Sequence, residues 1–279
     1  MILLEYILGV GLATAGPPLV GINSTPQIDS GHSTFLESIV IGAATLLPVS
    51  VPIHYANEYA DVETDALTER TSFSGGSGAL ERTGLPRAFL RTAVLGSSVA
   101  AAVVVAITAP LELPLDAVAL LVTIFGLGLA YSLPPFAFVH RGVGEVDNAV
   151  LGGLLLPLYG VAVVASPEPA AAVAVVPFTL VVGCNLLASH WPDRDADETV
   201  GKRTVTVRWS PARTRRGFTV LAGLAIFAGA ILWINNVVLT TVAVAHLVPI
   251  PFLLWGRAVL TRQRSPLPAV LAITSTVAW

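Results

Sequence analysis

Residues 36–65 read LESIVIGAATLLPVSVPIHYANEYADVETD, an apolar run whose last nine residues hold four carboxylates and one amide. An apolar run of about 20 residues is long enough to cross a bilayer as a helix. The acidic residues that follow the run directly would then lie at the membrane edge. The stretch therefore predicts a membrane-spanning helix with a carboxylate-rich end in water.

The whole chain has the composition of a membrane protein. Its 279 residues are 54% hydrophobic and 12% charged, with a mean hydropathy of +0.77, whereas an average soluble domain is about 25% charged. Spanning segments must be helical here, because lipid cannot satisfy open backbone groups. We therefore expect an all-α integral membrane protein with a single domain over residues 1–279. The candidate spanning helices are the apolar runs near 2–22, 36–56, 89–109, 115–138, 146–165, 170–190, 217–234, 237–256 and 266–279.

The basic residues predict the orientation of these helices. All fifteen Lys and Arg fall in or beside alternate loops, and the loops between them have none. Because positive charge is retained on the cytoplasmic side, we expect a multi-pass protein of the cell membrane with its N-terminus inside and its C-terminus outside. The first run has no basic segment before it, so it is expected to be retained rather than cleaved as a signal peptide. The polar stretches 57–88 and 191–216 are then cytoplasmic loops.

Two acidic clusters lie on this cytoplasmic side. Asn57, Asp61 and Asp65 are four residues apart and share one face if the helix continues, and Asp193 and Asp197 repeat the spacing. Like charges at this spacing weaken a helix, so something should compensate for them. Hard oxygen ligands suit magnesium, which is usually bound together with substrate phosphates. These five residues are therefore predicted to bind two Mg²⁺ ions, which would let a diphosphate approach.

Cations near the two clusters are the expected ligands for the remaining phosphate oxygens. They are Arg70, Arg141, Lys202 and Arg203. An interpretation without metal or phosphate stays open, because a charge run at a membrane edge is often only a solvated loop. The segment SFSGGSGAL at 72–80 is either a flexible linker or a turn whose backbone amides meet phosphate.

At these residues the chain resembles the UbiA superfamily of intramembrane aromatic prenyltransferases. Members have nine helices, a motif NDxxDxxxD after the second and DxxxD after the sixth. Here the first motif reads NEYADVETD at 57–65, with Glu58 in place of the usual Asp, and the second reads DRDAD at 193–197. The continuation ETVGKRTVTVR is similar to the family's GKRT segment. Ser189 and His190 depart from the Asn-containing stretch that relatives often carry.

Two further segments resemble the menaquinone branch, the 1,4-dihydroxy-2-naphthoate polyprenyltransferases. The loop after the first motif reads RTSFSGGSGAL at 70–80, where enzymes for other acceptors commonly carry an RPxRP-like segment. The stretch YSLPPFAFVHRGVGE at 131–145 is similar to that branch's tyrosine-to-GLGE stretch, with Arg141 and Glu145 matching.

The resemblance implies Mg²⁺-dependent transfer of a polyprenyl group from its diphosphate to an aromatic acceptor, with the naphthoate of menaquinone biosynthesis as the expected acceptor. Asp61 or Asp65 is a candidate for removing the phenolic proton. Tyr131, together with Phe73 and Tyr159, is a candidate for stabilising the allylic cation through its aromatic face. The expected partners are these two substrates and the lipid bilayer, and no nucleic acid.

Two alternatives remain. The acceptor could be another substrate of this superfamily, 4-hydroxybenzoate or geranylgeranylglycerol phosphate, although the RPxRP-like segment is missing. The protein could also be a non-enzymatic transporter or ion channel, because intramembrane acids mark ion paths as well as catalytic sites. The acidic clusters lie at one membrane face rather than at mid-span, which favours the enzyme.

Overall fold

The computed structural model describes residues 1–14, 35–71, 73 and 75–277, and in these residues every regular element is helical. The elements are α1 (Ile2–Thr14), α2 (Phe35–Leu67), α3 (Ala79–Thr83), α4 (Arg87–Glu112), α5 (Leu115–Ser132), the 3₁₀ turn η1 (Phe138–His140), α6 (Gly144–Val150), the π-helical turn η2 (Leu151–Leu155), α7 (Leu156–Val164), α8 (Pro169–Ala174), α9 (Val176–His190), α10 (Arg194–Thr199), α11 (Val205–Arg208), α12 (Pro211–Ile234), α13 (Thr240–Ala245), α14 (Ile250–Val259) and α15 (Leu267–Val277).

Within this described part, six helical segments are long and apolar enough to cross a membrane. They are α2, most of α4, α5, the continuous segment from α6 to α7, α12, and the segment from α13 to α14. The helices α1, α9 and α15 are apolar but shorter. These segments follow the predicted apolar runs in order, which confirms an all-α protein with membrane-spanning helices. That all nine runs span, and on which side each terminus lies, stay predictions; residues 15–22 of the first run and 278–279 of the last lie outside the described residues.

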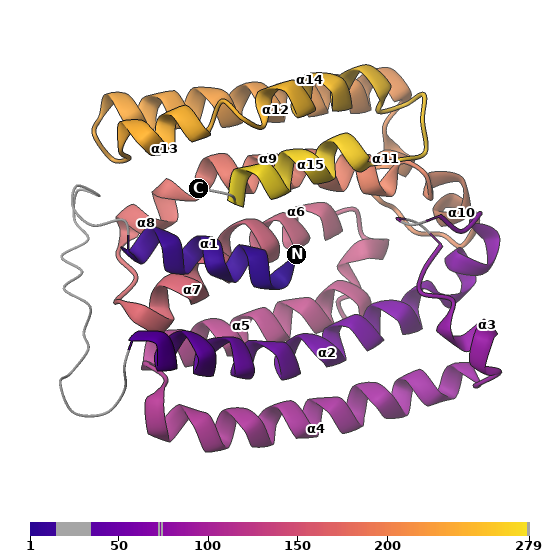
Figure 1. The fold of residues 1–279 in the computed structure, drawn as a ribbon. Helices are drawn as coiled ribbons and strands as arrows, with labels where there is room; N and C mark the ends of the chain where they lie inside the picture. Colours follow the sequence, from indigo (N-terminus) through magenta and orange to yellow (C-terminus); the bar gives the residue numbers. More distant parts are fainter. Residues whose placement is uncertain (15–34, 72, 74, 278–279) are drawn as a thin grey trace.

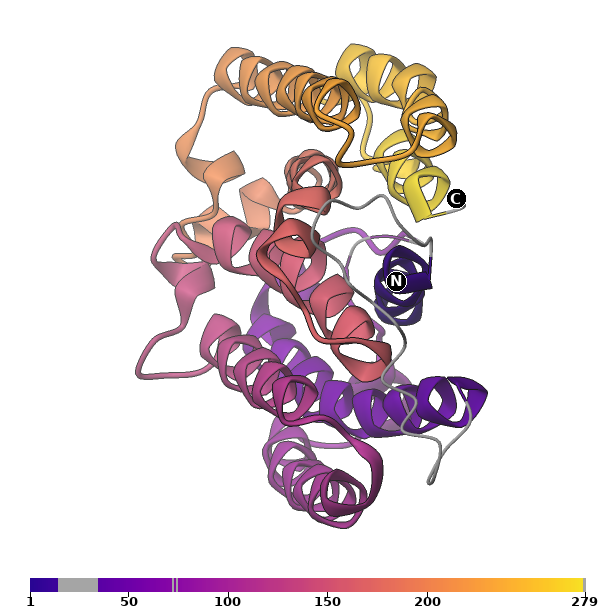
Figure 2. The same cartoon turned by 90° about the vertical axis from the view of Figure 1, so that its left-hand side faces the viewer.

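The long helices run roughly side by side, and α3, α10 and α11 gather with the end of α2 at one end of the bundle (Figure 1). Viewed along the helices, α4 lies on one side of the molecule and α12 and α14 on the opposite side, with α1 between α2 and α15 (Figure 2). The helix α2 packs against α4 and α5, and α9 packs against α12, α15 and α6. The two acidic segments therefore reach the same end of one bundle.

The outer helices carry a lipid-facing surface. Along α4, Leu95, Val99, Val103 and Ile107 are all exposed and four residues apart, so they form one apolar stripe on the outside of the helix. In the interior, by contrast, Leu46 and Leu121 are fully buried. Apolar side chains facing outward suit a helix surrounded by hydrocarbon rather than by water.

The short helix α1 is held inside the bundle by a close crossing with α7. A Cβ at Gly9 would lie 1.8 Å from the carbonyl oxygen of Pro157, and one at Gly160 would lie 2.2 Å from that of Tyr6. Such close backbone approach is typical of small residues at helix crossings in membranes. The Tyr6 hydroxyl also donates a hydrogen bond of 2.8 Å to the carbonyl of Ile39 on α2. Contacts with α7 on one side and with α2 on the other therefore hold α1 in position.

The polar stretches predicted as loops are partly helical. The helix α2 continues to Leu67, so the first motif lies on a helix, and α3 and the start of α4 occupy the rest of residues 57–88. Residues 191–216 contain α10, α11 and the start of α12. Ion pairs described below compensate the like charges that would otherwise unwind these turns.

Candidate active site

The first motif lies on the last three turns of α2. The Asn57 side-chain amide donates a hydrogen bond of 3.1 Å to Oδ2 of Asp61, and the Ser132 hydroxyl at the end of α5 donates one of 3.4 Å to Oδ1 of Asn57. The amide therefore links the carboxylate of Asp61 to the neighbouring helix. This fixes the direction in which the first motif faces.

The second motif folds back on itself through one tight turn. The backbone N–H of Asp197 donates to the carbonyl of Asp193 at 2.8 Å, which starts the short helix α10. Gly201 then adopts a φ of +79°, a left-handed conformation that favours glycine. The N–H of Lys202 donates to the carbonyl of Asp197 at 2.9 Å. The side chain of Lys202 is thereby brought back over the motif.

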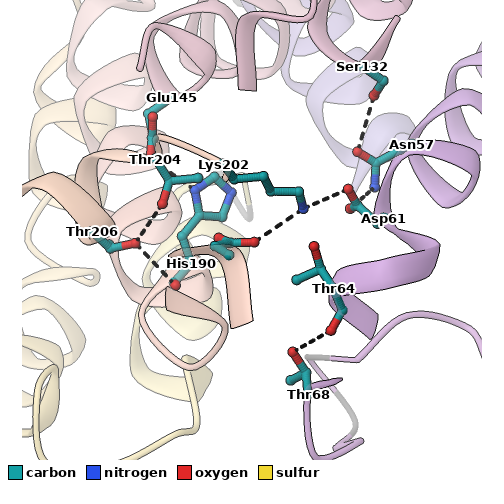
Figure 3. Close-up of polar contacts among 11 residues, drawn as sticks. Asn57, Asp61, Thr64, Thr68, Ser132, Glu145, His190, Lys202, Thr204 and Thr206 are labelled. Carbon is teal, nitrogen blue, oxygen red and sulfur yellow. Dashed lines mark hydrogen bonds and ion pairs between the residues drawn. The ribbon is translucent and has the colours of Figure 1, made fainter. Parts of the chain in front are cut away.

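Lys202 joins the two motifs. Its Nζ lies 2.7 Å from Oδ1 of Asp61 and 3.2 Å from Oδ1 of Asp197, and its side chain is only 6% exposed. Figure 3 shows the lysine extending from the segment between α10 and α11 towards Asp61 and Asn57 on α2. One carboxylate from each of the two motifs thus contacts the same ammonium group.

The charges at this junction depend on one another. Burial raises the pKa of the Asp197 carboxyl, although the neighbouring Lys202 opposes the shift. Burial alone would lower the pKa of Lys202, but Asp61 and Asp197 outweigh it and raise that pKa. The ammonium group therefore stays charged at neutral pH, as the carboxylates around it require.

The glycine-rich segment after the first motif packs against the acidic face of α2. A Cβ at Gly76 would lie 2.0 Å from Oδ2 of Asp65, and the N–H of Ser77 donates to Glu58 at 3.0 Å. Arg70 closes the segment, donating from Nε to the carbonyl of Gly75 at 3.2 Å and pairing with Glu81 at 2.9 Å. Residues 75–80 of the predicted linker-or-turn thus form a turn against the motif; Ser72 and Ser74 lie outside the described residues. A cavity of about 520 Å³ opens beneath this turn.

The paired motifs agree with a comparison of the whole sequence. Residues 28–274 match the UbiA prenyltransferase family. The chain belongs to this family. It is therefore a prenyltransferase, and its apolar helices are those of a membrane-integral enzyme. No curated protein and no solved structure matches the chain.

Prenyltransferases of this family generally use Mg²⁺ with diphosphate substrates. In the described part of the chain, no three His, Cys, Asp or Glu side chains lie close enough together to ligate one ion. The Lys202 ammonium, 3.2 Å from the buried Oδ1 of Asp197, supplies the positive charge between the two motifs. Carboxylate and amide oxygens are the donors that Mg²⁺ prefers.

The described contacts of the other three predicted phosphate ligands are with other groups than Asp61 and Asp197. Arg70 is half-exposed in the glycine-rich turn. Arg141 is exposed and donates to the carbonyl of Pro135 at 2.5 Å. Arg203 is exposed directly after Lys202. Of the four predicted cations, the described contacts bring only Lys202 to the carboxylates of both motifs.

The three predicted aromatic groups are placed differently. Tyr131 lies on the last turn of α5 with its ring against Gly144, where a Cβ would lie 3.0 Å from Cε2 of the tyrosine, and the next residue, Ser132, contacts Asn57 of the first motif. Phe73 is exposed in the turn after α2. Tyr159 packs against the Tyr6 ring and donates to the carbonyl of Gly42 at 2.8 Å. Of the three, Tyr131 is thus the one placed beside the junction.

The pairing of Glu145 with His190 was not anticipated from the sequence. Oε1 of Glu145 lies 3.2 Å from Nδ1 of His190 and accepts a 2.6 Å hydrogen bond from the N–H of Val205. The Thr206 hydroxyl donates to the carbonyl of His190 at 3.2 Å. These contacts tie α6, α9 and α11 together, which positions the segment that carries Lys202 (Figure 3). The sequence signal that could have indicated this pair is a polar residue at one end of each of two apolar runs: Glu145 precedes the run at 146–165, and His190 ends the run at 170–190.

A cavity of about 350 Å³ extends from His190 into the bundle between α1, α2, α5, α6, η2, α7 and α9. Apolar side chains line most of it. Its polar lining residues include Glu5, His54, Asn148, Asn185, Ser189 and His190. The prenyltransferase therefore has an internal space next to its paired acidic motifs.

Proposed function

We propose that the enzyme transfers a polyprenyl group from polyprenyl diphosphate to 1,4-dihydroxy-2-naphthoate in an Mg²⁺-dependent reaction. The observation that carries the proposal is the buried junction of Asp61, Lys202 and Asp197. It brings the two acidic motifs to one place, and a mixed set of carboxylates and a cation is suited to holding metal and phosphate together.

The metal site is proposed to comprise Asn57, Asp61, Asp65, Asp193 and Asp197. Mg²⁺ bound there would neutralise the negative charge that develops on the leaving diphosphate. Lys202 lies within the same group of side chains and is proposed to bind the diphosphate oxygens, with Arg70, Arg141 and Arg203 as further phosphate ligands.

The remaining parts of the site are proposed to control the allylic cation and the acceptor. The apolar lining of the cavity is proposed to keep water away from the cation, which water would otherwise capture. Tyr131 is proposed to stabilise the cation through the face of its aromatic ring. Asp61 or Asp65 is proposed to accept the phenolic proton of the acceptor, because both lie at the acidic end of α2.

The naphthoate is proposed as the acceptor because of the glycine-rich turn. It replaces the RPxRP-like segment of enzymes for other acceptors, and Gly76 and Ser77 in this turn lie directly against Asp65 and Glu58. Because the turn packs against the acidic face of α2, its sequence is expected to influence which acceptor can bind there.

The test is prenyl transfer by purified protein in lipid with geranylgeranyl diphosphate and Mg²⁺. The naphthoate, 4-hydroxybenzoate and geranylgeranylglycerol phosphate are offered separately. We expect product with the naphthoate alone, none in EDTA, and none with Asp61→Ala. The matched control Asp116→Ala removes an exposed acid at the other end of α5 and should keep full activity. Product with a different acceptor alone would overturn the proposed substrate, and full activity in EDTA would overturn the metal requirement.

A further inference from the structure

A buried acid in the internal cavity has no part in the function proposed so far. Glu5 on α1 is 5% exposed and lines this cavity. Met1, which carries the terminal amino group, lines the same cavity. An ionisable group inside a membrane bundle is costly and is a functional-site candidate by default.

The local backbone leaves room for this carboxyl group. At η2 the helix widens to a π-helical turn, a feature often found at functional sites. Gly153 in this turn packs against α9, where a Cβ would lie 2.5 Å from Cα of Thr179. The preceding Gly152 faces α1, and a Cβ there would lie 3.2 Å from Oε1 of Glu5. The carboxyl group thus occupies the space that a glycine leaves open.

A second polar group in the cavity lacks a described partner. Oδ1 of Asn185 on α9 is buried without a hydrogen bond to any described residue. Asn148 and Ser189 line the same cavity. Buried polar atoms are normally hydrogen-bonded. A cavity lined by a buried acid and by an amide oxygen without a described partner is therefore suited to a ligand that donates hydrogen bonds.

The prenyl chain and the aromatic acceptor differ in polarity, so different cavities of the protein suit them. A prenyl chain is wholly apolar, and a groove between α2, α4 and α5, lined by Val49, Ala101, Val105 and Phe125, suits it better. A hydroxylated aromatic ring needs an apolar cavity with a few polar groups, and a volume of about 350 Å³ is typical of small-ligand pockets. A ring hydroxyl can donate a hydrogen bond to the Glu5 carboxyl oxygen, whereas the carboxylate of the naphthoate has no hydrogen to donate.

We propose that Glu5 is an acceptor-binding residue, whose carboxyl oxygen accepts a hydrogen bond from a ring hydroxyl of the aromatic acceptor. Asn148 and Asn185 are the further polar contacts of the ring. This inference rests on the proposed function, because it assumes an aromatic acceptor with a hydroxyl group. It adds to that function the residue that selects a hydroxylated ring over one without a hydroxyl.

The experiment compares Glu5→Leu, Glu5→Gln and the control Ile7→Ala, all in the 279-residue protein in lipid. Glu5→Leu removes the hydrogen-bond acceptor and should raise the KM for the naphthoate about tenfold, the loss expected for one hydrogen bond of this kind. The KM for the prenyl diphosphate should stay unchanged. Glu5→Gln keeps an accepting oxygen and should recover most of the affinity. Ile7→Ala shortens an exposed apolar side chain on the same helix that does not line the cavity, and should leave both KM values unchanged.

A binding measurement gives a readout that does not need turnover. Quenching of tryptophan fluorescence is followed with 1,4-dihydroxy-2-naphthoate and with 2-naphthoate, which lacks the hydroxyls. Glu5→Leu should weaken the first about tenfold and leave the second unchanged.

The outcomes separate the two proposals. If wild-type protein transfers the prenyl group and folded Glu5→Leu protein keeps the wild-type acceptor KM, this inference alone is wrong. Equal changes in both KM values, or equal weakening of both naphthoates, also overturn it, because they show general damage to the cavity. Wild-type protein that neither binds nor prenylates the hydroxylated naphthoate overturns the proposed acceptor and this inference together.

Discussion

At the scale of single residues, the junction depends on one buried cation. The Lys202 ammonium lies between Asp61 and Asp197 and is almost fully buried. Breaking a buried ion pair by removing one partner leaves the other charge without compensation, which costs far more than the loss of an exposed pair. Stability and metal binding are therefore linked at this residue.

Lys202→Met should destabilise the protein by about 3 kcal/mol in EDTA, because two carboxylates lose their counter-charge. Excess Mg²⁺ should recover part of the loss by binding the folded state. The control Arg264→Met breaks an exposed pair with Glu69 and should cost less than about 1 kcal/mol. Thermal unfolding of both variants, with and without Mg²⁺, measures the difference. Equal losses in the two variants would contradict the buried junction.

Gly76→Ala should abolish most activity. Its φ is +64° and its Cβ would lie 2.0 Å from Oδ2 of Asp65, so the substitution moves either the turn or the carboxylate. Gly84 has a similar φ of +68° with nothing within 4 Å of the added Cβ. Gly84→Ala should therefore lose similar stability and keep its activity. Transfer assays at matched thermal stability test this, and equal activity in both variants would show that Asp65 need not be fixed in place.

At the scale of elements, the crossing of α1 with α7 decides whether Glu5 reaches the cavity. The two backbones touch at Gly9 and Gly160. Association of helices in lipid relies on such close packing, because apolar burial gives no advantage there.

Gly9→Ala should lower the thermal stability and raise the acceptor KM, because the new methyl group collides with the carbonyl of Pro157 and α1 must move. Gly11→Ala on the same helix meets nothing within 4 Å. It should be neutral, or more stable by up to about 1 kcal/mol because of the better helix propensity of alanine. Thermal unfolding in detergent compares the two, and equal melting temperatures would contradict the close crossing.

The elements also show what the sequence can predict. Hydropathy locates the apolar helices because each needs only local information, and the four-residue spacing of Asn57, Asp61 and Asp65 correctly places them on one face of a helix. The π-helical turn at η2 could not be predicted, since it depends on packing against α9. The contact of Lys202 with Asp61 could not be predicted either, because it joins residues far apart in the chain. The predicted role of Lys202 in binding phosphate stays a prediction.

At the scale of the whole molecule, the distribution of basic residues predicts the orientation in the membrane. The acidic junction lies at one end of the bundle (Figure 1), and the positive-inside rule predicts that this end faces the cytoplasm. Labelling from one side of the membrane tests this prediction.

In a Cys184→Ala background, Thr83→Cys and Asn235→Cys each introduce a single thiol at an exposed position, at the end of α3 and directly after α12 respectively. A membrane-impermeant maleimide added to intact cells should label Asn235→Cys. It should label Thr83→Cys only after permeabilisation. The reverse pattern would invert the orientation, and labelling of both in intact cells would rule out a barrier between the two ends.

The pairing of Asp61 with Lys202 also sets an order for biosynthesis. The carboxylate emerges from the ribosome early and its counter-charge emerges late, after α4 to α9 have been made. Throughout that interval Glu63 can already pair with Arg87, but Asp61 lacks the ammonium group of Lys202. A nascent chain that stops before residue 202 cannot form the junction, so the two motifs can be joined only after α9 and α10 have been made.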